Sequence, residues 1–155
     1  MPEQETLRRA RRDKREGKAP STQAGEFIRE EMHHIREGKH GAQSAKQAIA
    51  IGLSKARRAG VGLAPPKSGT ASSTTTRRAQ RDYEVGHGAP KRQRATAKRA
   101  RATEAALKRE PKSAASHSAL SRQAKKAAHA RSPAARSAAA RKAAHTRTAH
   151  HGRAG

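Results

Sequence analysis

The sequence contains no cysteine and no tryptophan, and its aromatic side chains are limited to Phe27 and Tyr83. Without cysteine the chain can form neither disulfides nor thiolate zinc sites, and it is compatible with a reducing compartment. Two aromatic residues cannot build the stacking platforms on which many single-strand nucleic-acid binders hold bases. These absences exclude a disulfide scaffold and argue against a typical single-strand binder.

Large apolar side chains are also scarce. Leu, Ile, Val and Phe together account for 12 of the 155 residues, far below the roughly 20% under which a highly charged chain tends not to fold. No apolar run has the length of a membrane span, and residues 1–12 lack the apolar stretch of a signal peptide. The sequence therefore predicts a cytoplasmic protein with extensive disorder and no membrane partner.

Positive charge dominates what remains. The chain has 36 Lys and Arg against 12 Asp and Glu, a formal net charge of +24. Residues 1–40 hold 10 basic and 8 acidic side chains, whereas residues 111–155 hold 10 basic side chains and no acidic one. Such a chain attracts polyanions, and no carboxylate in its C-terminal segment competes with an external phosphate. This composition predicts nucleic acid as the partner.

Glycine and proline breaks divide the chain into five predicted segments. They are a charged N-terminal helix or arm (1–20), a helical hairpin (21–64), a flexible linker (65–92), a basic helix (93–110) and an Ala/Lys/Arg-rich tail (111–155). The first segment offers only Leu7 and Ala10 as apolar contacts, so a solvated, fraying helix is expected. Pro65, Pro66 and Gly69, followed by a Ser/Thr run, predict the linker. The expected fold class is mostly α with extensive disorder.

The first helix of the predicted hairpin shows the clearest periodicity in the chain. Ile28, Met32 and Ile35 recur at i, i+4 and i+7, which predicts an amphipathic helix over residues 23–37. Gly38 then suits a left-handed C-terminal cap.

The second helix of the hairpin is predicted from its ends. Ser44 and Gln47 have the spacing of a capping box, and Gly60 suits a C-terminal cap, so a helix is expected from Ala45 to Ala59. The few apolar residues make this hairpin marginal, and self-association or polyanion binding would stabilise it. The glycine-flanked turn between the helices could also hold a phosphate, although a plain interhelical turn is favoured.

The tail combines high helix propensity with no apolar face. Residues 111–155 include 16 alanines, and Leu120 is their only large apolar side chain. Charge repulsion should keep this segment largely unfolded until phosphates neutralise it, so a conditionally helical tail that folds on binding is predicted. Pro111 and Ser113 mark its start, and Pro133 interrupts it.

The predicted DNA contacts are basic side chains of the second hairpin helix, the basic helix region and the tail. They are Lys46, Lys55, Arg57, Arg58, Arg92, Arg94, Lys98, Arg99, Arg101, Arg122, Lys125, Lys126, Arg131, Arg136, Arg141, Lys142 and Arg147.

Catalytic and metal-binding patterns are weak. Glu30, Glu31, His33 and His34 contain two overlapping Glu-x-x-His spacings, which occur in di-iron bundles. Those sites need a second such pair and two more glutamates, so the four residues are predicted to be solvent-exposed, and a metal contact by Glu37 and His40 is equally disfavoured. No phosphate-binding loop, nucleophile elbow or His-Glu-x-x-His motif occurs. We expect no enzyme, metal or cofactor.

Two stretches carry a resemblance to known proteins. EFIREEMHHIREGKHGA (26–42) and SAKQAIAIGLSKARRAG (44–60) resemble a family of uncharacterised small basic proteobacterial proteins over residues 20–66. The resemblance implies a bacterial cytosolic protein and no established activity. The composition of residues 111–155 is similar to that of linker-histone tails and bacterial histone-like proteins.

Together these features predict a histone-like or nucleoid-associated protein that binds DNA without sequence specificity, by neutralising phosphates. An RNA- or ribosome-associated protein is an alternative, because a polycation distinguishes duplex types poorly. A protein-binding adaptor is another, since the Phe27, Ile28, Met32 and Ile35 stripe suits a partner groove. Sequence-specific regulation is less favoured, because the second hairpin helix lacks an outward row of Asn, Gln and Arg.

Overall fold

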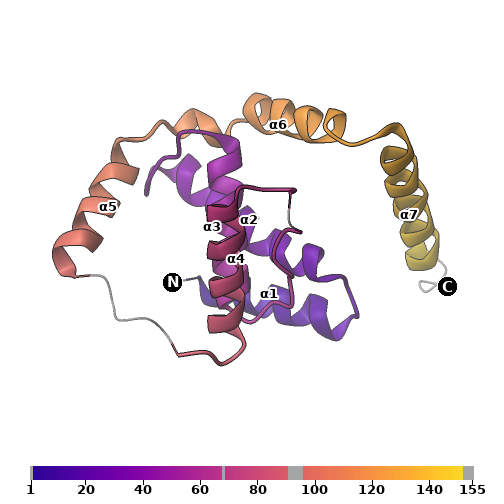
Figure 1. Cartoon of the computed structure of the whole chain (residues 1–155), viewed down its shortest axis with the longest axis horizontal. Coiled ribbons are helices and arrows are strands. Elements are labelled where there is room, and N and C mark those ends of the chain that lie inside the picture. Colours follow the sequence, from indigo (N-terminus) through magenta and orange to yellow (C-terminus); the bar gives the residue numbers. More distant parts are fainter. Residues whose placement is uncertain (1, 68, 91–95, 152–155) are drawn as a thin grey trace. The chain divides into compact units, whose positions relative to one another are not determined.

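The computed structural model describes residues 2–67, 69–90 and 96–151, apart from the side chains of His150 and His151, and these ranges contain helices but no strand. The helices are α1 (Gln4–Arg15), α2 (Pro20–Glu37), α3 (Ala45–Arg58), α4 (Ser73–Gly86), α5 (Ala97–Arg109), the 3-10 turn η1 (Lys112–Ala115), α6 (His117–His129) and α7 (Pro133–His151) (Figure 1). None of these helices is both long and apolar enough to cross a membrane. The prediction of a mostly α chain is confirmed. The chain divides into two compact units, residues 1–119 and 120–155.

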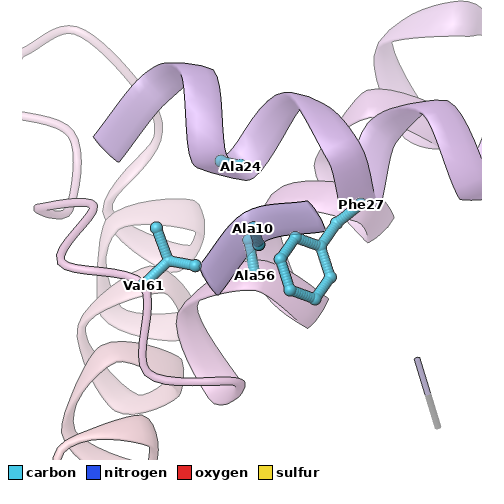
Figure 2. Packing of buried hydrophobic residues seen from close by; sticks show 5 residues of the cluster. All are labelled: Ala10, Ala24, Phe27, Ala56 and Val61. Atoms are coloured by element: carbon cyan, nitrogen blue, oxygen red, sulfur yellow. The ribbon is translucent and has the colours of Figure 1, made fainter. Parts of the chain in front are cut away.

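The core of the first unit is built largely from alanine. Ala10 of α1, Ala24 and Phe27 of α2, Ala56 of α3 and Val61, which follows α3, form one buried cluster (Figure 2). Small side chains allow the helices to approach closely, and the single phenylalanine is fully buried between them. This packing explains how a chain with so few large apolar residues forms a buried core.

The first helix belongs to this core, so the prediction of a solvated, fraying helix is wrong. α1 packs on α2, and its Thr6, Ala10 and Asp13 are buried. The ammonium of Lys18 donates to the Asp13 carboxylate at 2.8 Å, just after the helix ends. The N-terminal segment is therefore docked along its length.

The hairpin of α2 and α3 begins and ends close to where the sequence predicts. α2 ends at Gly38, whose φ of 80° is left-handed. The Ser44 hydroxyl accepts the backbone N–H of Gln47 at 3.2 Å, as expected for an N-cap. The Gln47 side chain accepts from the N–H of Gln43 at 2.8 Å rather than from Ser44, so the capping box is shifted by one residue on that side. The local signals at both helix ends are confirmed.

A helix occupies much of the predicted linker, so the prediction of a flexible segment is wrong over Ser73–Gly86. Ser72 begins α4 by accepting the N–H of Thr75 at 3.2 Å. The carboxylate of Asp82 accepts from Ser54 and Arg58 of α3, both at 2.6 Å. The Ser/Thr run that suggested a linker is thus the capped start of a helix that packs on α3.

The segment after α5 folds back onto the turn between α2 and α3. The N–H of Gly41 donates to the carbonyl of Leu107 at 2.8 Å, and the N–H of Ala42 donates to the carbonyl of Pro111 at 3.2 Å. Ala115 of η1 is fully buried. The folded unit therefore continues beyond Glu110, where the tail was predicted to begin.

The second unit consists of exposed helix. Ser116, rather than the predicted Ser113, caps α6 by accepting the N–H of Ala119, and Ser132 caps α7 by accepting from Ala135, both at 3.2 Å. From residue 121 to 149 every side chain except Gln123 is exposed. The predicted interruption at Pro133 is confirmed, whereas the extensive disorder expected of the tail is not observed in these residues.

Candidate nucleic-acid interface

One cationic stripe of the described chain runs along α6. Arg122, Lys125, Lys126 and His129 recur at i, i+3, i+4 and i+7, and all four side chains are exposed. At 100° per residue, these positions share one side of the helix, with Leu120 on the other. The stripe is about 10 Å long at 1.5 Å per residue. A stripe of this length can meet several phosphates of a duplex.

The remaining predicted contacts of the tail are distributed differently. Arg136 and Arg147 lie eleven residues apart on one side of α7, whereas Arg141 and Lys142 lie on the other side. All four are exposed, as is Arg131 between the two helices, and the Nε of Arg147 donates to the carbonyl of Ala143 at 3.4 Å. α7 therefore carries cations around its circumference rather than along one stripe.

The two units differ in how their charge is balanced. Residues 120–155 contain nine Lys and Arg and no side-chain carboxylate. Several basic side chains of the first unit, in contrast, contact acids within the same unit, as in the pairs Arg9–Glu26, Lys18–Asp13, Lys39–Glu37, Lys55–Glu31 and Arg58–Asp82. The positive potential of the protein is consequently least compensated in the second unit.

α5 carries three of the predicted contacts. Lys98, Arg99 and Arg101 are exposed along this helix. Near its end, Lys108 pairs with Glu104 at 2.8 Å, and this contact lowers the pKa of the Glu104 carboxyl. Arg92 and Arg94 lie outside the residues that the structure describes.

The predicted contacts on α3 fall into two groups. Lys46 is exposed near the start of the helix and is available to a ligand. Arg57 is only 7% exposed, its guanidinium donates to the carbonyls of Leu63 and Ala64 at 3.1 and 3.3 Å, and burial lowers its pKa. Arg57 therefore holds the chain after α3 in place, and its prediction as a DNA contact is wrong.

Lys55 and Arg58 are also occupied by partners within the first unit. The Nζ of Lys55 lies 2.6 Å from Oε2 of Glu31. The Nε of Arg58 donates to Asp82 of α4 at 2.6 Å, although Arg58 itself is mostly exposed. Sequence patterns placed these cations on the polar side of α3, but their partners lie on other helices and gave no local signal.

A buried acidic cluster on α2 was not predicted. Glu30 and Glu31 were expected to be exposed, yet both are buried, and only His33 of the original group is exposed. Oε1 of Glu31 lies 3.3 Å from Nε2 of His40 in the turn after α2. The prediction failed because α3 and this turn cover the side of α2 that carries the two glutamates.

The N-terminus closes one edge of this cluster. The Nε2 of His34 lies 2.9 Å from Oε1 of Glu3, and the Nζ of Lys39 lies 3.3 Å from the same oxygen. The pKa of the Glu3 carboxyl is held below its usual value. The hydrogen bond from His34 is the largest cause, and the hydrogen bond from Lys39 is the next largest. The N–H of Glu3 also donates to Oε2 of Glu30 at 3.1 Å. These contacts join the start of α1 to the end of α2.

Comparison with known proteins identifies neither a family nor a function for this chain. The resemblance of residues 20–66 to a family of small basic proteobacterial proteins therefore stays a prediction, as does the histone-like character of the tail. No protein-family model matches the chain, and no curated protein or solved structure is significantly similar to it.

Proposed function

We propose that the protein binds double-stranded DNA through the phosphate backbone, without reading sequence, and that its second unit is the principal anchor. The observation that carries this proposal is the α6 stripe of Arg122, Lys125, Lys126 and His129, set in a unit without side-chain carboxylates. Each cation that meets a phosphate releases condensed counterions, which supplies most of the affinity in non-specific binding. Compaction or coating of DNA follows more naturally from this surface than recognition of a site.

Sequence reading has little support among the available side chains. Phosphate contacts position a protein but carry no base information. The chain contains no asparagine, and Gln123 is the only amide side chain after residue 110. The two residue types that pair bidentately with adenine are therefore nearly absent from the proposed anchor.

DNA binding would also stabilise the helices of the second unit. Arg122 and Lys126, and likewise Lys125 and His129, are four residues apart on α6, where like charges destabilise a helix by a few tenths of a kcal/mol per pair once both are charged. No buried apolar face compensates, so these helices depend on alanine propensity and on their serine caps. Phosphates remove the repulsion, and helix content should rise with binding.

The aromatic and apolar side chains of the first unit argue against the adaptor hypothesis and against base stacking. The adaptor hypothesis rested on the stripe of Phe27, Ile28, Met32 and Ile35. Ile28 is half-buried, and the other three are buried in the unit itself. Tyr83, the remaining aromatic residue, is half-buried and stacked on His87 at 4.0 Å between ring centroids. Neither a helix-binding surface nor a base-stacking platform is presented by these residues.

The test compares two full-length triple variants with the same change in net charge. Arg122→Gln, Lys125→Gln and Lys126→Gln together remove the α6 stripe, while Arg11→Gln, Lys14→Gln and Arg15→Gln remove three exposed cations of α1. Fluorescence anisotropy with a labelled duplex, measured over a range of salt concentrations, gives the slope of log affinity against log salt. The α6 variant should lose about 2 to 3 units of slope, at roughly 0.9 per phosphate contact, and the α1 variant much less.

Equal losses from the two variants would contradict the assignment to α6, because net charge alone would then explain binding. Unrelated duplexes of equal length should bind alike. Tighter binding to duplex RNA than to duplex DNA at the same salt would make RNA the partner instead.

A further inference from the structure

The turn between α2 and α3 brings three metal-ligating side chains together. One ligand atom from each of Glu31, His34 and His40 lies within 4.8 Å of the others. The two histidines are only 13% and 18% exposed, and the Glu31 side chain is 1% exposed. We propose that Glu31, His34 and His40 form a zinc-binding site that fastens the N-terminal segment, α2 and the turn after it. This proposal is independent of DNA binding.

The ring of His40 is oriented as a ligand would be. Its Nδ1 lies 3.1 Å from the carbonyl oxygen of Gly41, which can only accept, so Nδ1 carries the proton. In the neutral ring, Nε2 then presents its lone pair, and this atom lies 3.3 Å from Oε1 of Glu31. Zinc-bound histidines commonly donate their other N–H to a backbone carbonyl in this way.

His34 has the other common partner of a metal-bound histidine. Its Nε2 lies 2.9 Å from the Glu3 carboxylate, so Nε2–H donates there and Nδ1 is left with a lone pair. A carboxylate that fixes the tautomer and orientation of a ligating imidazole raises the basicity of the ring. Glu3 is therefore a positioning residue in this proposal and not a ligand.

Glu31 supplies the anionic ligand. It is fully buried, and neither of its oxygens accepts a hydrogen bond of good geometry, although Nζ of Lys55 lies 2.6 Å from Oε2. A buried carboxylate whose lone pairs are poorly satisfied destabilises a fold. Lys55 offsets part of the charge from the Oε2 side, and a cation at Oε1 would satisfy the rest.

The dimensions and the donor set suit zinc. Bonds of about 2.0 to 2.2 Å to nitrogen and oxygen in a tetrahedral site place neighbouring ligand atoms roughly 3.3 to 3.6 Å apart by the same geometry. The separation of 3.3 Å between His40 and Glu31 already lies in this range. Two imidazoles and one carboxylate leave a fourth position for water, as in other three-ligand zinc sites.

Calorimetric titration of the full-length protein with zinc chloride tests the site. Wild-type protein should bind one equivalent that His34→Gln and His40→Gln each weaken by 100-fold or more, while Glu3→Gln weakens it by about 10-fold. His33→Gln is the matched control, because His33 adjoins His34 on the same helix but is exposed and outside the cluster. It should leave this equivalent unchanged.

A second variant tests the site even if the glutamine variants lose their fold. His40→Cys, loaded with cobalt chloride, should give a thiolate-to-cobalt charge-transfer band that wild-type protein and a His33→Cys control lack. Absence of that band, or zinc binding by His40→Gln equal to that of wild type, would overturn the proposal and leave the cluster as an ordinary buried ion-pair network.

Discussion

Gly52 of α3 lies against the backbone of Ile28 on α2. A Cβ atom at Gly52 would be 2.8 Å from the Cα of Ile28 and 3.0 Å from its amide nitrogen. The Cγ1 of Ile28 would also lie at 3.0 Å, but moving this side chain cannot relieve the contact, because the other two atoms belong to the main chain of another helix. The hairpin therefore depends on glycine here for its close packing.

Gly52→Ala should destabilise the first unit by about 1 to 3 kcal/mol, as expected for overpacking, even though alanine favours helix. Gly25→Ala is the matched control, since Gly25 also lies within a helix but has open space at its Cβ. It should be neutral or stabilise by up to about 1 kcal/mol. Urea unfolding followed by circular dichroism measures both. A stabilising Gly52→Ala would contradict the close approach of α2 and α3.

A similar contact fixes the segment after α5. A Cβ at Gly41 would overlap the carbonyl oxygen of Glu110. Gly41→Ala should therefore detach residues 107–115 from the turn, and the N–H of Ala42, which donates to Pro111, should exchange with solvent faster. Gly62→Ala, at a position with no atom within 4 Å of its Cβ, should leave this exchange unchanged. Unaltered protection in Gly41→Ala would show that the docking is not held by this contact.

Leu53→Lys separates the stability of the first unit from DNA binding. Leu53 is half-buried and packs against the alanine-rich core, so a charged replacement should cost about 1 to 3 kcal/mol. Affinity for duplex DNA should survive, because the proposed anchor lies in residues 120–155. Loss of binding in folded Leu53→Lys protein would place recognition in the first unit.

Hydrogen exchange should distinguish the two units before and after DNA is added. Amides of α6 and α7 should exchange quickly in the free protein, because no buried face protects them, while those of α2 and α3 should exchange slowly. Saturating duplex DNA should slow α6 and α7 selectively, and helical circular dichroism should rise. Equal protection of α3 and α7 in the free protein would contradict the marginal stability of the second unit.

The hairpin could be predicted from sequence because its signals are local. Ile28, Met32 and Ile35 mark the buried side of α2, and Gly38 and Ser44 mark the ends of the two helices. The docking of α1 could not be predicted, since its apolar contacts are only Ala10, which is buried, and Leu7, which is partly buried, and two residues produce no recognisable hydrophobic pattern.

The candidate sites, like the fold, could be predicted only where the sequence signal is local. The cationic tail follows directly from composition, whereas the roles of individual cations depend on distant partners. Lys55 and Glu31 are on different helices, and His40 meets Glu31 only because the turn after α2 folds back. A spacing rule applied within one helix finds Glu31 and His34 but not the third member of their cluster.

The central claim is that the second unit anchors the protein on DNA, and the salt dependence of binding tests it most directly. The protein should be truncated after Ala119, because residues 111–115 are part of the first unit. This truncation removes nine basic side chains. If six to eight of them meet phosphates, the slope of log affinity against log salt should become shallower by about 5 to 7 units, equally for unrelated duplexes. A truncated protein that remains folded and keeps the full slope would contradict the account.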